Sequence, residues 1–568
     1  MRIALLPLDE RPVNATLPAH IAAIAGVEVL TPPAELLPRM RTPGRADELT
    51  GWLAEVAGEA DALVVSLDML GYGGLIGSRT TLDAASVVVE RLAVLERIRP
   101  SRPRLPITAV TTVMRASRSY SPAEEPEYWS QHGVELHDLG GALHREFLGE
   151  SHERERLTAA VPADVQADFW LRRLRNHTVD LFALGLAGRG TLDTLLVTAD
   201  DTAPRAAGSL EQVWLRHWVS ATGLDTRVLM YPGADEVGSV LVARALADGP
   251  AGKEGSRDAV ELSSAEDGQS GQAGQAAQEE PVREEAAQEE PVHDEAVRIA
   301  IEICEEGGAD RIAPYENVPV AAGVARQISA AGAEVVPGGG RLGGAPDGGE
   351  PSGTVPGGAE SGERAVADAV IVVHAPDPHR GDRTRAGEAT DRKVVQAVVD
   401  RVAELVEAGR SVGVADVRYV NGADPGLVRA LAERGVLDRI TAYGGWNTAG
   451  NTVGSVVAAL VAHVVGHRRG GVDETAQSRL RWHRIVEDYA YQAVVRGELA
   501  QEQPYGDHMS VPFADPADVE SYLERCAKRL PEVAEELGGA DARRWLISAP
   551  RLPWGRTFEI DFDLVPRA

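Results

Sequence analysis

The sequence predicts an α/β protein built on a mainly parallel β-sheet. Short apolar runs recur along the chain, and stretches with apolar residues at helical spacing separate them. A cluster of polar residues follows nearly every apolar run. Strands that are apolar on both faces and alternate with helices are typical of parallel sheets made of βαβ units.

The expected elements follow the chain in order. The apolar runs predict strands at residues 2–7, 27–30, 62–67, 107–113, 194–199, 227–231, 333–336, 369–374, 411–416 and 438–443. Residues 84–98 and 392–408 carry apolar side chains at helical spacing and predict two of the helices between the strands.

Two architectures accommodate this alternation: a (β/α)8-barrel-like sheet with additions, or two doubly wound sheets in tandem. The carboxyl ends of parallel strands lie on one side of a sheet, where α/β proteins bind their ligands. In a closed barrel all the polar clusters would share one mouth. We therefore favour the barrel, with the tandem sheets as the alternative.

Two segments interrupt the pattern. Residues 249–296 are strongly acidic and repeat the string AAQEEPV, and residues 338–364 consist largely of Gly and Pro. Neither segment can bury enough apolar surface to offset the entropy lost on ordering. We expect both to be disordered insertions in one α/β domain that spans residues 1–471.

The character of the chain changes after this domain. Residues 474–499 and 516–538 have the spacing of long amphipathic helices, and residues 553–564 end in alternating apolar side chains. Residues 472–568 are therefore expected to form a helical C-terminal region that ends in a strand.

Composition narrows the possible partners. The chain has 57 Lys and Arg against 86 Asp and Glu, a net charge of −29, which repels nucleic acid and anionic membranes. The N-terminus lacks the pattern of a secretion signal, and no apolar stretch has the length of a membrane span. We expect a cytoplasmic protein without nucleic-acid or membrane partners. It could form a homo-oligomer, and no motif for a cofactor or a resident metal is present.

The polar residues that follow the strands form the predicted binding site. Carboxylates, amides and arginines hold sugar hydroxyls, and an aromatic ring can lie beneath a sugar face. We expect a small carbohydrate substrate to be bound by Asp9, Glu10, Arg11, Asn14, Asp68, Tyr72, Arg115, Tyr231, Glu316, Asn317, Asp416, Asn421, Trp446 and Asn447.

Long motifs carry a resemblance to a known family. They are LPLDERPVN, SLDMLGYGGLIGSR, DDTAP, YPGADEVG, YENVPV, GGWNTAGNTVG and LPWGRTFEI. With them the chain resembles the bacterial domain-of-unknown-function family 4127 over essentially its whole length, apart from the two insertions. The resemblance implies a family and no particular chemistry.

Two pairs of adjacent carboxylates follow predicted strands, Asp200-Asp201 and Asp235-Glu236. They resemble the acidic pairs of substrate-assisted N-acetylhexosaminidases. The resemblance implies that the first residue of a pair orients the 2-acetamido group of the substrate and that the second is the general acid/base. Asp201 and Glu236 could equally flank the scissile bond of a retaining enzyme with a protein nucleophile.

These observations predict a glycoside hydrolase, a substrate-assisted N-acetylhexosaminidase similar to β-N-acetylglucosaminidases. One alternative is a metal-dependent hydrolase or lyase in which Asp9, Asp68, Asp200 and Asp235 hold a hard cation such as Mg²⁺. Another is a carbohydrate-binding protein without catalytic activity, because both kinds of site use the same residue types.

Overall fold

The computed structural model describes residues 1–150, 153–200, 202–249, 296–337, 366–378, 390–502 and 511–567. Its strands form two parallel sheets and one antiparallel hairpin. The predicted class, mixed α/β with mainly parallel strands, is confirmed. Asp201 and nearly all of the two predicted insertions lie outside the described residues.

The first sheet contains six strands in the order β2-β1-β3-β4-β5-β6. Neighbouring strands run parallel throughout, and Ile3 of β1 pairs with Ala62 of β3. The strands are β1 (Arg2–Leu6), β2 (Glu28–Leu30), β3 (Ala62–Ser66), β4 (Ile107–Val113), β5 (Thr194–Ala199) and β6 (Val228–Pro232).

The second sheet contains five strands in the order β11-β10-β9-β7-β8. Its strands are β7 (Val297–Ile303), β8 (Ala333–Val336), β9 (Ala369–His374), β10 (Ser411–Asp416) and β11 (Ala442–Gly444). Strand β7 was not predicted, because charged residues interrupt its apolar pattern. One of them, Glu302, is neutralised by an ion pair with Arg401.

Both sheets repeat one topology. Counted within each sheet, the strand order is 2-1-3-4-5, the doubly wound order, and the first sheet adds β6 at its edge. This is the tandem alternative of the sequence analysis. No pairing among the described strands closes either sheet into the barrel that we favoured. The polar strand ends still converge, since Asn447 after β11 donates to Asp235 after β6.

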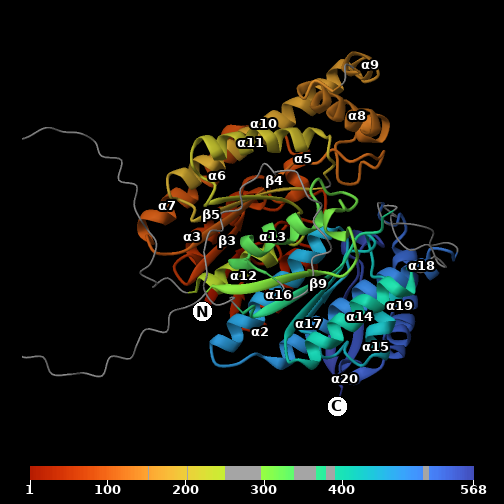
Figure 1. Cartoon of the computed structure of the whole chain (residues 1–568). Coiled ribbons are helices and arrows are strands. Elements are labelled where there is room, and N and C mark those ends of the chain that lie inside the picture. The colour runs from red at the N-terminus through yellow and green to blue at the C-terminus, as the bar shows by residue number, and fades with distance from the viewer. Residues whose placement is uncertain are drawn as a thin grey trace, which may run out of the picture.

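A layer of helices separates the two sheets (Figure 1). Ile3 and Leu5 of β1 face this layer, while Ala4 and Leu6 face the opposite side of the first sheet. This alternation explains why the strand is apolar throughout. The layer consists of α1 (Pro12–Ala15), α2 (Leu17–Ile24), α12 (Val237–Asp248), α13 (Val320–Ala330), α16 (Ala449–Arg468) and α17 (Glu474–Ile485).

Helix α16 is the core helix of this layer. Among the described residues it is the one helix long and apolar enough to cross a membrane, and 94% of its most apolar window is buried inside the protein. Its apolar side chains therefore pack against α12, α2, α13 and the second sheet.

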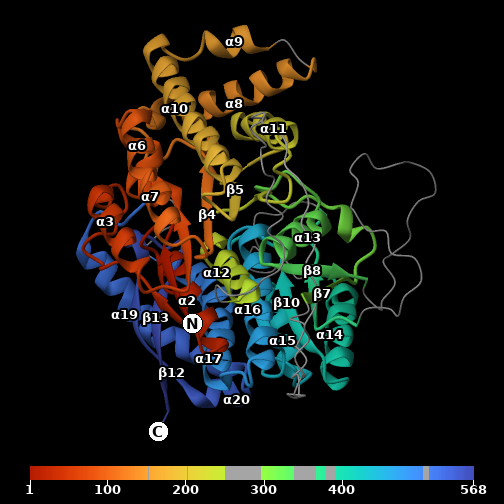
Figure 2. The same ribbon diagram turned by 90° about the vertical axis from the view of Figure 1, so that its left-hand side faces the viewer.

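A second set of helices follows the strands of the first sheet, mostly over its outer face. Figure 2 shows α8, α9 and α10 extending beyond the sheet. The helices are α3 (Ala46–Val56), α4 (Leu67–Tyr72), α5 (Leu75–Thr80), α6 (Ala85–Leu92), α7 (Val94–Ser101), α8 (Trp129–Phe147), α9 (Arg154–Thr158), α10 (Ala163–Gly188) and α11 (Ala207–Ala221).

The outer face of the second sheet packs against α14 (Arg392–Glu407), α15 (Pro425–Glu433) and the C-terminal region. The predicted helix 474–499 comprises α17, a π-helical segment (Val486–Val495) and α18 (Arg496–Leu499). The predicted helix 516–538 is α19 (Pro516–Glu536). Then come α20 (Gly539–Arg544) and a hairpin of β12 (Trp545–Arg551) and β13 (Asp561–Pro566).

Candidate functional site

Arg11 is the centre of the candidate site. It lies just after β1, where Pro12 occupies the first position of α1 and starts that helix. Its guanidinium is buried and donates to Asp9 Oδ2 from Nε at 3.0 Å and from Nη2 at 2.6 Å. It also donates to both carboxylate oxygens of Asp235, at 3.2 and 2.5 Å. One arginine thus joins the ends of β1 and β6.

The amides around Arg11 complete this cluster. Asn14 Nδ2 donates to Asp9 Oδ1 at 2.9 Å, and Asn447 Nδ2 donates to Asp235 Oδ2 at 3.1 Å. Asn447 has a φ of 56°, a conformation that asparagine adopts more readily than most residues. Burial raises the pKa of Asp235, and Asp9 adds to the rise, while Arg11 opposes it. The predicted residues Asp9, Arg11, Asn14, Asp235 and Asn447 therefore meet in one place.

A second cluster of charges lies at the ends of β4 and β5. Asp200 forms ion pairs with Arg79 of α5 and, at 3.7 Å, with Arg115. Both arginines also pair with Glu124, each at 3.0 Å, and Arg115 pairs with Glu125 at 2.8 Å. The predicted residues Asp200 and Arg115 thus share one network, and Asp200 is close enough to Asp235 to raise its pKa.

The C-terminal segment 553–559 reaches both clusters. Arg556 pairs with Glu124, and Glu559 lies 3.6 Å from Arg11. The Trp554 indole packs 4.4 Å from the Arg11 guanidinium, measured to the ring centroid. Although burial opposes it, Arg115, Arg556 and Arg79 hold the pKa of Glu124 well below its ordinary value. Burial raises the pKa of Glu559 to about 7.

The second predicted pair, Asp235-Glu236, is split by the fold. Glu236 is fully buried. Its carboxyl lies against Gly233 and accepts a hydrogen bond from Ala234 N at 3.0 Å, and its Cβ and Cγ lie against Gly454. Burial raises its pKa well above the ordinary value. Asp235 faces the Arg11 cluster, whereas Glu236 faces the helical layer between the sheets.

Three more predicted residues lie near Glu236 and away from Arg11. Burial and the nearby Glu236 raise the pKa of Tyr231. Glu316 accepts a hydrogen bond from Gly450 N at 2.8 Å, and Asn317 is half-buried beside it. This group joins the two sheets through the interior of the protein.

Asp68 and Tyr72 of α4 contact the core of the first sheet. Asp68 Oδ2 accepts a hydrogen bond from Thr112 N at 3.0 Å, and burial raises its pKa to about 7. Tyr72 belongs to the core of the outer face, with the Arg175 guanidinium 4.8 Å from its ring. The structure does not bring Tyr72 to the Arg11 cluster.

Asp416 lies in a separate buried network of the second sheet. It accepts hydrogen bonds from Asp424 N at 2.7 Å and from the Tyr443 hydroxyl at 3.0 Å. Asp424 in turn bonds to His374 Nε2 at 3.0 Å. Burial raises the pKa of Asp416 to about 6.

Asn421 and Trp446 connect this network to the Arg11 cluster. Asn421 N donates to the carbonyl oxygen of Asn447 at 3.0 Å. The Trp446 side chain is buried, 6.1 Å from the Phe558 ring and 5.7 Å from the Arg484 guanidinium. Trp446 therefore packs the C-terminal segment against the end of β11, and its ring is not an open platform for a sugar.

An open groove of about 420 Å³ borders the Arg11 cluster, between the β1–α1 turn and the C-terminal hairpin. Glu10, Arg11 and Trp554 contribute to its lining. Its volume lies in the range of small-molecule sites, roughly 300–1,000 Å³. Of the predicted site residues, Glu10 and Arg11 reach this groove.

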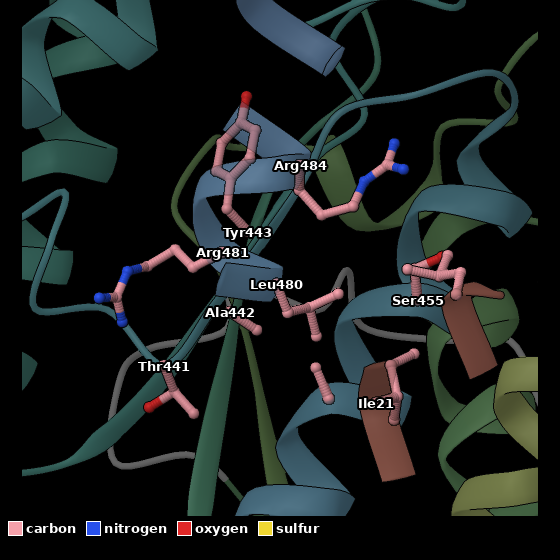
Figure 3. A pocket seen from close by; sticks show the side chains of 10 residues that line it. Ile21, Thr441, Ala442, Tyr443, Ser455, Leu480, Arg481 and Arg484 are labelled. Atoms are coloured by element: carbon pink, nitrogen blue, oxygen red, sulfur yellow. The ribbon is translucent and has the colours of Figure 1, made fainter. Parts of the chain in front are cut away.

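The cavity drawn in Figure 3 is of a different kind. It encloses about 10 Å³ where α2, β11, α16 and α17 meet, which is room for a single water at most. The Arg481 and Arg484 side chains point in opposite directions around Leu480. This space is a small packing void.

Five residues of these clusters were not among the predicted site residues: Arg79, Glu124, Trp554, Arg556 and Glu559. Glu124 follows no strand directly, and the last three lie beyond all the parallel strands. The motifs SLDMLGYGGLIGSR and LPWGRTFEI contain Arg79 and the three C-terminal residues. These two motifs were the sequence features that could have identified Arg79 and the three C-terminal residues as site residues.

The described residues offer no group of three Asp, Glu, His or Cys side chains placed to hold a metal ion. The arrangement of charges explains why the described carboxylates do not gather around a common point. Arg11 occupies the space between Asp9 and Asp235, and Asp68 is directed at Thr112. A guanidinium takes the position that a cation between these carboxylates would need.

Comparison with known proteins identifies one family. The profile described as "Protein of unknown function (DUF4127)" matches residues 3–339 and 353–563. No curated protein and no solved structure was found to match the chain.

Proposed function

Because this chain belongs to the DUF4127 family, described as proteins of unknown function, we propose its function from the site: it is a glycoside hydrolase. More specifically, we propose a substrate-assisted N-acetylhexosaminidase acting on a small carbohydrate. The substrate lies at the carboxyl ends of the first sheet, over the Arg11 cluster and the groove beside it.

The position of Asp235 carries the proposal. Its side chain is held by two guanidinium contacts from Arg11 and one amide contact from Asn447, so its orientation is set before a substrate binds. Substrate assistance needs a fixed carboxylate that aligns the 2-acetamido group and stabilises positive charge as the acetamido oxygen attacks C1. Asp235 supplies such a carboxylate.

The other predicted carboxylates take different roles in this proposal. Glu236 is fully buried, so it supports the helical layer and does not protonate the leaving group. Asp200, with Arg79 and Arg115 beside it, binds sugar hydroxyls. We therefore do not propose Glu236 as the acid/base, and Asp201 lies outside the described residues.

Hydrolysis of a panel of chromogenic glycosides, with and without a chelator, tests this function. We expect release from N-acetylhexosaminides that the chelator does not change. Asp235→Asn should lower kcat/KM for them by about 100-fold or more, because the charge-stabilising carboxylate is lost.

The matched control is Asp225→Asn, an exposed aspartate outside the site, which should leave turnover within two-fold of wild type. If no glycoside of the panel is hydrolysed but sugar binding is measurable, a binding protein without catalysis would be favoured. Activity that a chelator abolishes and one divalent metal restores would favour a metal-dependent hydrolase. Wild-type activity of Asp235→Asn would show that Asp235 does not assist catalysis.

A further inference from the structure

Helix α10 has a second apolar face that the described residues leave uncovered. Its buried face packs against α6, α11 and the first sheet. The opposite face carries apolar or small uncharged residues at alternating intervals of four and three positions: Ala167, Leu171, Leu174, Thr178, Leu181, Gly185 and Gly188. Leu171 and Leu174 are 63% and 61% exposed. We call these seven residues the α10 stripe.

The period of the α10 stripe is that of a seam between two helices. Apolar residues repeated every 3.5 positions keep one face of a helix directed at a partner helix along its whole length. The stripe continues without a charged residue from Ala167 to Gly188, which is about 32 Å at 1.5 Å per residue. Monomeric soluble proteins rarely expose a contiguous apolar surface unless it binds something. The pattern therefore indicates that a second helix covers this face.

The two glycines of the α10 stripe support a close approach from outside. A Cβ at Gly188 would meet Leu224 Cδ1 at 3.8 Å, an ordinary contact, and a Cβ at Gly185 would meet the end of the flexible Arg189 side chain. The described fold therefore has room for side chains at both positions, although glycine weakens a helix relative to alanine. Space kept open on an exposed helix face suits the side chains of a partner.

Aromatic side chains of α11 border the α10 stripe. Trp218 is 50% exposed and lines an open groove of about 420 Å³ together with Leu181, Gly185 and Gly188. Trp214, one turn earlier, has its ring centroid 5.8 Å from that of His177 on α10. Figure 2 shows α10 and α11 at the opposite end of the molecule from the C-terminus. The tryptophans widen the stripe into a surface that two helices share.

The distribution of charge favours a second copy of the chain as the occupant. The whole chain carries a net charge of −29, so two copies repel each other over most of their surfaces. Helix α10 has three arginines and three aspartates and carries no net charge. Two copies can therefore meet through α10 without the repulsion that acts elsewhere.

We propose that the α10 stripe is the dimer interface of this protein, with α10 packed antiparallel against α10 of a second copy about a two-fold axis at Thr178. A two-fold interface must be complementary to itself. Thr178 is the central position of the stripe and meets its own counterpart there. Leu174 then faces Leu181 of the second copy, and Leu171 faces its Gly185. Large side chains of one half of the stripe thus meet the glycine-containing half. The dimer is independent of the proposed glycoside hydrolase function.

Sedimentation velocity of the full-length chain at several concentrations tests the dimer. We expect a wild-type dimer and, for Leu174→Glu, a dissociation constant raised by about 100-fold or more, because each dimer would bury two unpaired carboxylates. The matched control is Leu82→Glu, since Leu82 is 84% exposed and lies outside the stripe, and it should leave the dimer unchanged. A monomer at every concentration, or a dimer that Leu174→Glu leaves intact, would overturn the proposal.

Gly185→Leu tests the interface without introducing a charge. Leucine favours a helix more than glycine does, so a weaker helix cannot explain a weaker dimer. We expect the dissociation constant to rise by about tenfold or more, because the new side chain fills the space that Leu171 of the second copy takes. Gly51→Leu on the exposed face of α3 is the control, since nothing lies within 4 Å of a Cβ there. Wild-type affinity of Gly185→Leu would contradict this packing.

Disulfide cross-linking tests the direction of the two helices. A disulfide needs Cα atoms within about 7 Å, and a two-fold axis brings only central residues that close to their own counterparts. Thr178→Cys should therefore form a covalent dimer on oxidation, whereas Leu171→Cys should not, because its two copies lie about 21 Å apart. The wild-type chain, with Cys304 half-buried and Cys526 buried, gives the background. Cross-linking through Leu171→Cys and not through Thr178→Cys would show parallel helices and refute the antiparallel arrangement.

A lipid surface is the alternative occupant of an exposed apolar helix face. Flotation with phosphatidylcholine vesicles separates the two, because a dimer that covers the α10 stripe has no apolar face left for lipid. We expect the wild-type protein to stay unbound. A wild-type monomer that floats with the vesicles, and that Leu174→Glu releases from them, would make lipid the occupant and refute the dimer.

Discussion

At the scale of single residues, the protein buries many charges and satisfies them unevenly. Arg173 of α10 is matched by a bidentate ion pair with Glu211, with both distances at 2.6 Å. Asp180, on the same helix, forms no such ion pair within the part of the chain that the structure describes, and it accepts a hydrogen bond from the Thr111 hydroxyl at 2.6 Å. Burial raises the pKa of Asp180 to about 8, and the nearby Asp68 adds to the rise. A carboxyl of this kind is neutral in the folded protein near pH 7.

The pKa of Asp180 makes the stability of the fold pH-dependent. The folded state binds this proton more tightly than the unfolded state, so the stabilisation is complete below about pH 4 and is lost as pH rises toward 8. Between pH 6 and pH 8 the loss from this one group is about 2 kcal/mol. Asp180→Asn removes the titration, so its melting temperature should fall less than that of wild type over this interval.

Thermal unfolding followed by circular dichroism at several pH values measures this difference. Asp225→Asn, on an exposed loop, should reproduce the wild-type slope. If Asp180→Asn and wild type lost the same number of degrees between pH 6 and pH 8, Asp180 would not be the titrating group.

At the scale of elements, the helices between the sheets approach each other through small residues. Gly454 of α16 faces α12, and a Cβ at this position would overlap Glu236 Cγ and lie 2.6 Å from Gln327 Oε1. Gln327 belongs to α13 and donates to the carbonyl oxygen of Gly450 at 2.9 Å. The spacing of three helices therefore depends on one position without a side chain.

Gly454→Ala should lower stability although alanine favours helix formation. Overpacking a buried site costs about 1–3 kcal/mol, more than the roughly 1 kcal/mol that alanine gains over glycine in a helix. We expect a lower melting temperature, measured by differential scanning calorimetry. Gly497→Ala in α18 is the matched control, because nothing lies within 4 Å of its added Cβ, and it should be neutral or stabilising. An unchanged melting temperature for Gly454→Ala would show that the helices can move apart freely.

The π-helical segment Val486–Val495 is a second structural feature at the scale of elements. The sequence pattern predicts one continuous helix over residues 474–499 and gives no sign of the π segment. The carbonyl oxygen of Asp488 accepts a hydrogen bond from Ala423 N at 3.0 Å, and its side chain accepts one from Gly445 N at 2.7 Å. The altered helix thus binds the loops that follow β10 and β11.

At the scale of the whole molecule, the C-terminal segment 553–559 completes a site that begins at residue 9. It follows β12, which packs against α19, yet its side chains contact Glu10, Arg11 and Glu124, which follow strands of the first sheet. Arg556 pairs with Glu124, and its guanidinium lies 4.6 Å from the Trp554 ring and 4.7 Å from the Phe558 ring. Arg556 therefore both orders this segment internally and attaches it to Glu124.

Arg556→Met should loosen the segment without unfolding the sheets. Removing one partner of a buried ion pair is strongly destabilising locally, so amide exchange in residues 553–559 should accelerate by about tenfold or more. Hydrogen–deuterium exchange with mass spectrometry measures this directly. Arg543→Met, at an exposed position, should leave the exchange unchanged. Wild-type protection in Arg556→Met would mean that other contacts hold the segment.

Local sequence determined the class of the fold and most of its strands. The runs at β4 and β5 were predicted with their observed bounds, because strands buried on both faces consist of apolar and β-branched residues without charges. The run at 438–443 was placed too early, since Ile440 is a buried loop residue before β11. Strand β7 was missed because Arg298 and Glu302 give it a mixed pattern.

The tertiary structure alone decided which polar residues meet. Asp235 and Glu236 are adjacent in sequence, yet one contacts Arg11 and the other is buried against Gly454. Composition and spacing encode burial and local conformation, which involve residues a few positions apart. The contacts of Arg11 with Asp235, of Glu10 with Trp554 and of Arg556 with Glu124 join distant segments. They exist because two separate sheets pack their strand ends together and the C-terminal segment returns across them.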